Sequence, residues 1–152
     1  MSTPLAWQLC AFDELGTDQL YALLQLRSEV FVVEQQCAFQ DLDGLDAGAL
    51  HLSGTVDGVL LAYARCLPAG LKYAEASVGR IVTRAAARGS GCGHVLIDRA
   101  IQSVGASWGA QPIRIGAQAR LKAFYAGHGF RDMGSPYLED GIEHIEMVWR
   151  PS

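Results

Sequence analysis

Three glycines in the segment Arg88-Gly89-Ser90-Gly91-Cys92-Gly93 constrain the fold of this chain more than any other feature. An apolar run from Ser77 to Thr83 precedes the segment, and a run with helical periodicity from His94 to Trp108 follows it. This pattern predicts a strand, a glycine loop and the N-terminus of a helix. Glycines let the backbone approach a ligand closely, and the first turn of a helix has unpaired N–H groups beside the positive end of its dipole. The segment is therefore predicted to bind an anion such as a pyrophosphate.

Two other phosphate-binding loops do not match these residues. A Walker loop needs Lys followed by Ser or Thr after its last glycine, but His94 and Val95 follow Gly93. A dinucleotide fingerprint needs Gly-x-Gly-x-x-Gly, and its third glycine is missing whether the count starts at Gly89 or Gly91. The sequence thus argues against a kinase, an ATPase and a dinucleotide-binding loop.

The periodicity of apolar residues places this loop in a mixed α/β domain that spans residues 1–152. Three- and four-residue steps predict a helix from about Thr17 to Val32, and Asp57-Gly58 between two apolar runs predicts an antiparallel hairpin. The other expected elements are a strand from about Ala74 to Thr83, the helix after the loop with Val95 among its inward-facing residues, a strand from Pro112 to Ala117, a helix from Leu121 to Ala126, and a last strand with Ile145, Met147 and Trp149 on one face. A parallel crossover attached to antiparallel hairpins follows from this order.

Charge and apolar patterning exclude several classes of partner. The chain has 16 acidic and 12 basic residues, a net charge of −4, which argues against nucleic acid as the main partner. No apolar run approaches the roughly 20 residues of a membrane span, and Met1 to Leu9 does not look like a signal peptide. We therefore expect a cytoplasmic protein without a membrane partner. Nothing in the sequence determines the oligomeric state, so a homodimer stays open.

Cysteines and acidic residues do not predict a metal site. The four cysteines lack Cys-x-x-Cys spacing, which favours reduced, buried thiols, with Cys92 in the loop the one expected to be open to alkylating reagents. Asp41-Leu42-Asp43-Gly44-Leu45-Asp46 lacks the glycine and glutamate positions of an EF-hand. It is predicted to be a solvated turn.

The loop resembles that of a known enzyme family. Arg88-x-x-Gly91-x-Gly93 is similar to the coenzyme A loop of the GNAT N-acetyltransferases, and Leu121 to Phe130 resembles their later signature Phe-Tyr-x-x-x-Gly-Phe. The segments 26–36 and 137–147 resemble the ElaA-like branch, so the resemblance covers nearly the whole chain. It implies the GNAT fold, a mixed antiparallel and parallel sheet flanked by helices. It also implies acetyl-CoA as cosubstrate and transfer of an acetyl group to an amine.

The resemblance also implies roles for individual residues. In the family the strand before the loop splays from its neighbour, so its backbone is free to bind the pantetheine and the acetyl carbonyl. Tyr125 matches the position whose phenol protonates the departing thiolate. Lys122 either meets a coenzyme phosphate or is a solvated lysine. The residues expected to bind coenzyme are Ile81, Val82, Thr83, Arg88, Gly89, Ser90, Gly91, Cys92, Gly93, His94 and Lys122.

The base that takes a proton from the amine stays open. Other GNAT branches use a carboxylate on the strand before the loop, where Glu75 lies in this chain, although Ser77 occupies the nearer position. His144 shares one face of the last strand with Glu146, and His51 lies early in another strand. Glu75 and His144 are therefore the candidate bases, beside a relay through water.

The acceptor pocket is expected among residues of the ElaA-like segments. Its predicted border includes Glu34, Asp43 and His51, with Gln35 and Asp41 nearby. Arg80 either holds a carboxylate of the substrate or pairs with one of these acids.

The leading hypothesis is an acetyl-CoA-dependent N-acetyltransferase that uses direct attack by an amine, without a metal or a covalent intermediate. Its acceptor is a small-molecule amine or a protein amino group. The alternative is a non-catalytic acyl-CoA-binding or protein-interaction module on the same fold.

Overall fold

The structure is a computed structural model that describes residues 4–134 and 136–152. Within these residues, eight strands form one sheet in the order β1-β2-β3-β4-β5-β8-β6, and β7 pairs with β8. The strands are β1 Ala6–Ala11, β2 Leu50–Val56, β3 Val59–Leu67, β4 Ala76–Thr83, β5 Ile113–Gln118, β6 Arg131–Asp132, β7 Tyr137–Glu139 and β8 Ile142–Trp149. The α-helices are α1 Thr17–Arg27, α2 Cys92–Trp108 and α3 Lys122–Ala126. The expected mixed α/β architecture is confirmed.

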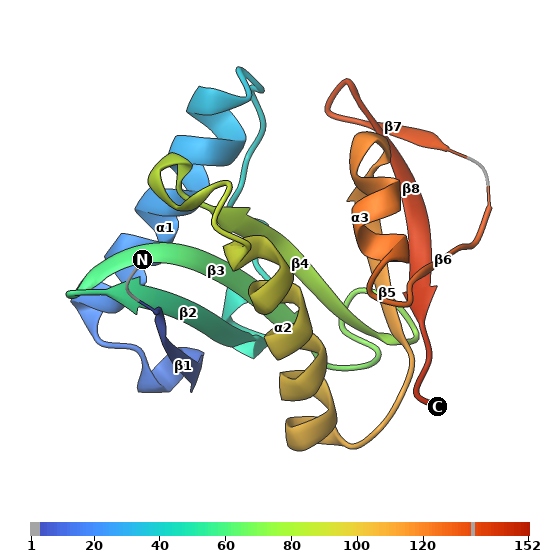
Figure 1. The fold of residues 1–152 in the computed structure, drawn as a ribbon, viewed down its shortest axis with the longest axis horizontal. Coiled ribbons are helices and arrows are strands. Elements are labelled where there is room, and N and C mark those ends of the chain that lie inside the picture. Colours follow the sequence, from blue (N-terminus) through green and yellow to red (C-terminus); the bar gives the residue numbers. More distant parts are fainter. Residues whose placement is uncertain (1–3, 135) are drawn as a thin grey trace.

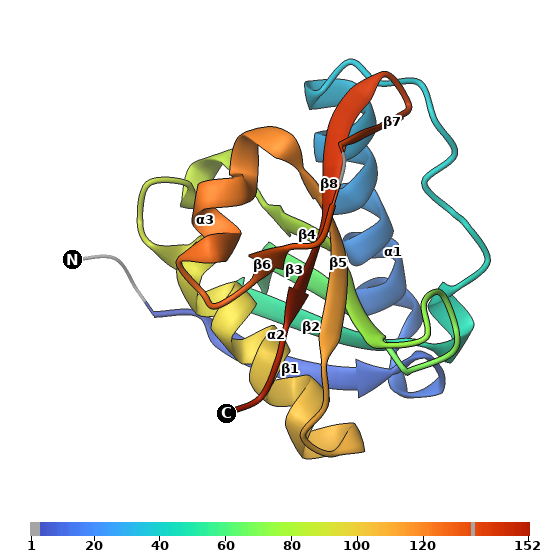
Figure 2. The same cartoon turned by 90° about the vertical axis from the view of Figure 1, so that its right-hand side faces the viewer.

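The helices cover both faces of the sheet. Figure 2 shows α1 on one side and α2 with α3 on the other. Leu96, Ile97, Ala100 and Val104 of α2 are buried in the larger apolar core, and Leu23 and Leu26 of α1 belong to a smaller core with Tyr63. Among the described residues, the sheet therefore lies between two separate apolar cores.

The prediction that Val95 faces inward is wrong, because its side chain is 45% exposed. At 100° per residue, Val95 lies roughly 160° around the α2 axis from the middle of the buried face. The spacing of apolar residues therefore assigned Val95 to the buried face of α2, although it lies on the exposed face.

The helix predicted to end near Val32 continues further and changes its hydrogen bonding. After α1, residues Ser28–Glu34 form the π-helix η2, with bonds such as Cys37 N–H to the Val32 carbonyl at 3.0 Å. Such wide turns often occur at functional sites. Here η2 directs Val30, Phe31 and Glu34 to the wall of a cleft.

The strand before the glycine loop separates from its parallel neighbour, as expected. β4 pairs with β5 only at Ala76 with Ile113 and Ser77 with Arg114, whereas it stays paired with β3 up to Thr83. Figure 1 shows β4 and β5 diverging as they leave this contact. The β5-facing edge of β4 is thus left without a strand partner, and the sheet opens into two halves.

A β-bulge redirects β4 at Arg80. Tyr63 pairs with Val82 and Arg65 with Gly79, so two residues of β4 lie opposite the single residue Ala64. Arg80 has φ 46°, a left-handed conformation that costs a residue with a side chain about 1–2 kcal/mol. Its ion pairs, described below, hold it there.

The sequence did not predict β1, β6 or β7. β1 is an edge strand whose residues are mostly exposed, and β6 and β7 have only two and three residues, so none has a clear alternation of apolar and polar side chains. In the described part of the chain, no helix combines the length and the apolar character needed to cross a lipid bilayer.

Candidate active-site cleft

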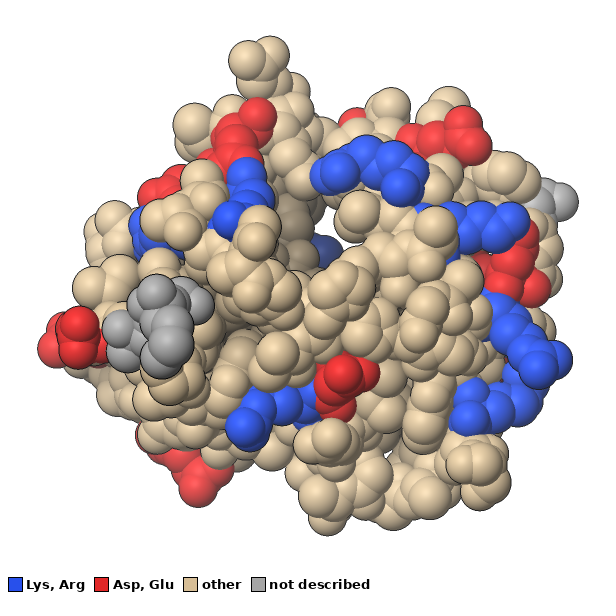
Figure 3. All heavy atoms as spheres, in the orientation of Figure 1, with Lys and Arg blue, Asp and Glu red and all other residues tan. Residues whose placement is uncertain are grey.

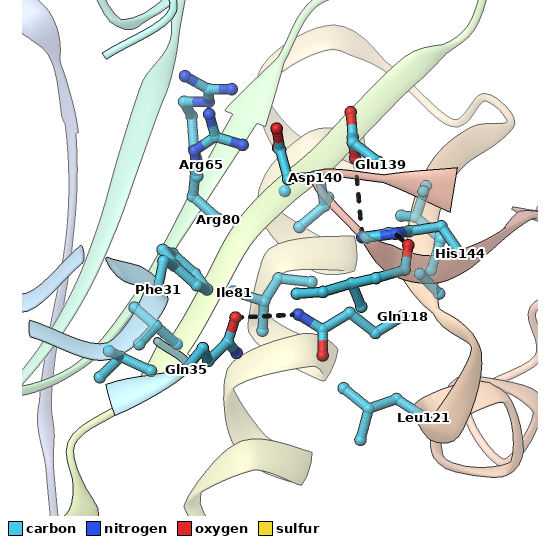
Figure 4. A pocket seen from close by; sticks show the side chains of 18 of the residues that line it. Phe31, Gln35, Arg65, Arg80, Ile81, Gln118, Leu121, Glu139, Asp140 and His144 are labelled. Carbon is cyan, nitrogen blue, oxygen red and sulfur yellow. Dashed lines mark hydrogen bonds and ion pairs between the residues drawn. The ribbon is translucent and has the colours of Figure 1, made fainter. Parts of the chain in front are cut away.

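A cleft of about 780 Å³ occupies the opening between the two halves of the sheet. The space-filling view is hollowed at this place (Figure 3). One wall comes from η2, β3 and β4, and the other from β5, α3 and the β7–β8 hairpin. Figure 4 shows Arg65, Arg80 and Ile81 facing Glu139, Asp140 and His144 across it. Of the residues predicted for the site, Glu34, Asp43, Arg80, Ile81, Val82, Thr83, Arg88, Tyr125 and His144 line this cleft.

The glycine loop lies next to the cleft, at the N-terminus of α2. Gly89 and Gly91 both have φ 83°, which favours glycine. Within the described residues, the N–H groups of residues 89–93 donate to no backbone carbonyl, whereas His94 and Val95 donate to Gly91. These free donors and the positive end of the α2 dipole form a site suited to an anion.

Part of the glycine loop also borders a second pocket. Ser90, Gly91 and Cys92 border a separate apolar pocket of about 510 Å³, away from the cleft. The Cys92 side chain is 5% exposed, and burial raises the pKa of its thiol. The expectation that alkylating reagents reach Cys92 is therefore wrong, because the thiol packs inward while the loop uses its backbone.

Arg88 connects the loop to η2. Its guanidinium donates to the Thr83 carbonyl at 2.8 Å and forms an ion pair with Glu34. The hydrogen bond from Arg88 lowers the pKa of Glu34. The Glu34 carboxylate is thus engaged with Arg88, at the side of the cleft next to the glycine loop.

Tyr125 reaches the cleft from α3. Its side chain is 6% exposed and makes edge contacts with the rings of Phe124 and Phe130, at centroid distances of 5.2 and 5.8 Å. Burial raises the pKa of Tyr125 to about 12. The phenol is therefore protonated at neutral pH and can donate a proton into the cleft.

His144 lies on the opposite strand, β8, beside Gln118 of β5. Its Nδ1 is 2.7 Å from the Ile142 carbonyl oxygen, and its Nε2 is 3.6 Å from the Glu139 carboxylate. The ring stacks on Tyr137, with centroids 5.6 Å apart and planes at 28°. This contact follows from strand pairing, because Tyr137 and His144 are direct cross-strand partners.

The prediction of a solvated turn for the segment 41–46 holds only for the exposed residues 42–44 and missed the arginine partners of its carboxylates. The segment forms a partly buried ion cluster in which Arg27, with an exposed fraction of 0%, binds Asp41 at 2.8 Å and Asp46 at 2.7 Å. Arg65, 1% exposed, binds Asp43 at 2.7 Å. These two arginines come from α1 and β3, far from the acids along the chain. The spacing of the acids alone therefore did not reveal their partners.

Arg80 is the third arginine of this ion cluster. Its Nε lies 2.8 Å from Asp41, and its Nη2 lies 3.4 Å from Asp43. Of the two alternatives for Arg80, the structure shows the ion pair with acids. It lines the cleft, but its charge is already compensated.

Two predicted residues lie outside the cleft lining. Glu75 precedes β4, and Arg114 holds its carboxylate with contacts of 3.1 and 2.9 Å. His51 is fully buried in β2, between the Tyr63 hydroxyl at 2.6 Å and the Asp46 carbonyl at 2.9 Å. Neither Glu75 nor His51 therefore lines the cleft, and both have their polar atoms engaged by other groups.

Two further predicted residues have partners on the outer surface. Lys122 forms an ion pair with Asp132 at 3.0 Å. His94 contacts His128 at 2.8 Å, and His128 contacts Asp98 at 2.7 Å. Neither Lys122 nor His94 lines the cleft, although His94 begins the helical hydrogen bonds beside the free loop amides.

Sequence reasoning missed several residues of the cleft. Arg65 interrupts an otherwise apolar strand, which is a signal that a buried partner exists. Tyr137 and Glu139 gave no such signal, because their importance depends on the pairing of β7 with β8. In the described residues, no group of three or more His, Cys, Asp or Glu side chains is arranged to hold a metal ion.

Comparison with known proteins identifies the family. A model of the acetyltransferase (GNAT) domain matches residues 23–151. The crystal structure of an acyl-CoA N-acyltransferase from Pseudomonas aeruginosa is 45% identical, covers 95% of this chain and 99% of its own, and superposes with a TM-score of 0.91. Protein ElaA of Escherichia coli is 41% identical over 146 residues, 95% of both chains, and its crystal structure gives a TM-score of 0.90.

A more distant structure shares the fold alone. The crystal structure of an aminoglycoside 6'-N-acetyltransferase complexed with coenzyme A is 14% identical, covers 95% of this chain and 99% of its own, and superposes with a TM-score of 0.71. The divergent sheet and the helices around it are thus those of the GNAT N-acyltransferase fold. The chain belongs to the GNAT family of acyltransferases, in the branch that includes ElaA.

Proposed function

We propose that this chain is an acetyl-CoA-dependent N-acetyltransferase in which a primary amine attacks the bound thioester directly. The observation that carries the proposal is the opening between β4 and β5, a cleft lined by Arg88, the first residue of the glycine loop, and by the buried Tyr125 of α3. The Pseudomonas relative is named an acyl-CoA N-acyltransferase, and the aminoglycoside enzyme of the same fold was solved with coenzyme A. Both names agree with an acyl-CoA substrate.

The residues present fit this coenzyme. The amides of residues 89–93 would bind its diphosphate, because unpaired N–H groups at a helix N-terminus favour anions. The free edge of β4 from Ile81 to Thr83 would bind the pantetheine amides in the manner of an added strand. Such binding holds the thioester still and removes most of the entropic cost of bringing it to the amine.

Tyr125 is proposed to protonate the departing thiolate. Its pKa of about 12 keeps the proton on the phenol until the thiolate forms, and its place in the cleft wall gives it access to the leaving group. Amine attack forms a C–N bond, and the C–S bond then breaks. The sulfur takes the phenol proton, and the nitrogen loses one in return.

The test is thiol release from acetyl-CoA with a panel of polyamines, amino acids, aminoglycosides and peptides. For Tyr125→Phe we expect kcat to fall on the order of 10²-fold, with little change in acetyl-CoA affinity. Tyr21→Phe is the matched control, because Tyr21 is 73% exposed on α1 and lies outside the cleft. Less than a few-fold loss in Tyr125→Phe at every pH contradicts the acid role. Tight binding of acetyl-CoA without turnover on any amine favours the non-catalytic module.

A further inference from the structure

We propose that His144 is the base that takes the proton from the acceptor ammonium, through Nε2, and that Glu139 stabilises the imidazolium that forms. This inference rests on the proposed N-acetyltransferase function and specifies how the amine is made nucleophilic. It gives His144 contact with the reacting nitrogen and gives Glu139 a positioning role.

The hydrogen bond at Nδ1 determines which nitrogen of His144 is free. The Ile142 carbonyl oxygen, 2.7 Å away, can only accept, so Nδ1 carries a proton and donates it. In the neutral ring this leaves the lone pair on Nε2. The tautomer is thus determined by the backbone of β8 itself.

The surroundings of Nε2 suit a proton acceptor. The His144 side chain is 11% exposed, its ring stacks on Tyr137, and Gln118 is its cross-strand neighbour on β5. Glu139 lies 3.6 Å from Nε2, too far for a direct hydrogen bond, and its carboxylate brings a negative charge to this side of the ring. Figure 4 shows Glu139 and His144 together at the cleft, with Asp140 beside them. A cationic amine that approaches these two carboxylates is drawn towards Nε2.

The other carboxylates near the cleft are already engaged. Glu34 is paired with Arg88, and Glu75 with Arg114 outside the cleft. Burial alone would raise the pKa of Asp43, but hydrogen bonds from Arg65 and the Leu45 amide hold it well below its ordinary value. Asp43 therefore keeps its negative charge and its partners instead of taking a proton.

Lys72 is the remaining basic group to consider. It lines the cleft, and burial lowers its pKa. Its ammonium lies 5.5 Å from the centre of the Tyr73 ring, an arrangement that favours the charged form. Burial and the cation–π contact therefore act in opposite directions on Lys72, whereas the backbone of β8 fixes the free lone pair of His144 on Nε2. His144 is for this reason the better candidate, and Lys72 is the alternative base.

The proton balance is complete without any further reactant. The ammonium gives one proton to Nε2, which releases it to solvent past the half-exposed Glu139. The neutral amine attacks and the C–S bond breaks as Tyr125 protonates the sulfur. The nitrogen then loses its second proton, and the Tyr125 phenolate takes up a proton from solvent in its place, which restores the phenol. The net products are an amide, a thiol and one proton.

The kinetic test uses the amine of the panel with the highest kcat/KM. For His144→Gln we expect kcat/KM to fall on the order of 10²–10⁴-fold and to lose its rise on the acid side of the pH profile. Acetyl-CoA affinity, measured by calorimetry, should stay unchanged, which separates this result from a failure of the proposed function. Added imidazole should restore part of the rate in His144→Ala. Glu139→Gln should lower the rate about 10-fold, whereas Glu143→Gln, an exposed control on the same hairpin, should not.

Lys72→Met decides between the two bases. It should keep the acid limb of the pH profile, and loss of that limb in Lys72→Met but not in His144→Gln overturns the proposal. A second measurement does not need an acceptor amine. In nitrogen-15 NMR spectra of the protein, the neutral His144 ring should carry its proton on Nδ1. A proton on Nε2 instead overturns the inference whether or not the panel contains a substrate. If the wild-type protein neither binds acetyl-CoA nor releases thiol, the proposed function itself fails.

Discussion

At Gly116 the absence of a side chain determines where an aromatic residue of the cleft lies. A Cβ at this position of β5 would lie 2.6 Å from the Tyr137 hydroxyl and 3.3 Å from that of Tyr73. Tyr137 in turn stacks on His144. Gly116 therefore leaves room for the ring that orients the proposed base.

We expect Gly116→Ala to displace Tyr137 and to disturb His144 through it. Overpacking of this kind costs about 1–3 kcal/mol, and a misplacement of about 1 Å lowers a rate by up to 10²-fold. Urea unfolding and kcat/KM on the panel amine measure the two effects. Gly105→Ala is the control, since nothing lies within 4 Å of a Cβ there and alanine favours the α2 helix. Unchanged kinetics in Gly116→Ala would show that Tyr137 does not orient His144.

Tyr125 and His144 were predicted from the sequence, but their neighbours were not. Tyr125 stands in a short motif whose spacing carries the information. Glu139 and Tyr137 meet His144 only because β7 folds back onto β8 over a tight turn at Asp140 and Gly141, both with positive φ. The spacing of residues along one strand does not predict that contact.

At the scale of elements, the ion cluster ties α1 and the bulge of β4 to the segment 41–46. Arg27 belongs to the buried side of α1, next to Leu23 and Leu26, and its charge requires partners there. Asp41 and Asp46 supply them from a segment without regular strands. The cluster therefore holds the wall of the cleft from which Arg80 and Asp43 project.

Replacement of Arg27 by methionine should destabilise the protein strongly. It leaves Asp41 and Asp46 buried with fewer partners, and breaking a buried pair in this way costs about 3–5 kcal/mol. Urea unfolding measures the change. Arg131→Met, at an exposed position of β6, should change the free energy of unfolding by less than about 0.5 kcal/mol. A similarly small effect of Arg27→Met would mean that the cluster relaxes or takes up water.

Most of the helices and strands around the glycine loop were predictable from the sequence, whereas the strands at the edges of the sheet were not. The helix α2 has helical periodicity, and the hairpin β2–β3 and the strand β4 are apolar runs of seven or more residues, so their sequences indicate buried elements directly. The edge strands β1 and β6 and the short β7 depend on partners far along the chain. The separation of β4 from β5 came from the family resemblance, because no apolar pattern shows where two parallel strands stop pairing.

At the scale of the whole molecule, the proposed reaction is divided between the two halves of the sheet. The half formed by β1 to β4 supplies the free strand edge and, through α2, the loop amides. The other half supplies Tyr125 and His144 from α3 and β8. The ion cluster belongs to the first half, so its charge state affects the wall that would hold the coenzyme rather than the groups that would move protons.

This arrangement predicts how stability depends on pH. Burial alone would raise the pKa values of Asp43 and Asp46, but hydrogen bonds and charges from Arg65 and Arg27 lower them in the folded state. A carboxylate with a lowered pKa stabilises the fold fully above its unfolded pKa of about 3.9, and this stabilisation is lost as the pH falls through the folded value. For His51, burial itself lowers the pKa. The unfolded chain therefore takes up a proton more readily than the folded protein below about pH 6.5, and some stability is already lost there.

We therefore expect the free energy of unfolding to be constant from about pH 8 to 7, to fall slightly towards pH 5 and to fall steeply below about pH 4. Urea unfolding at a series of pH values measures this curve. In Asp43→Asn the steep part should become shallower, because one carboxylate no longer has to be protonated, while the slight fall assigned to His51 stays. Asp57→Asn, in the β2–β3 turn, is the control and should leave both parts unchanged. An acid limb as steep in Asp43→Asn as in the wild type would mean that the cluster at the cleft wall is not what acid disrupts first.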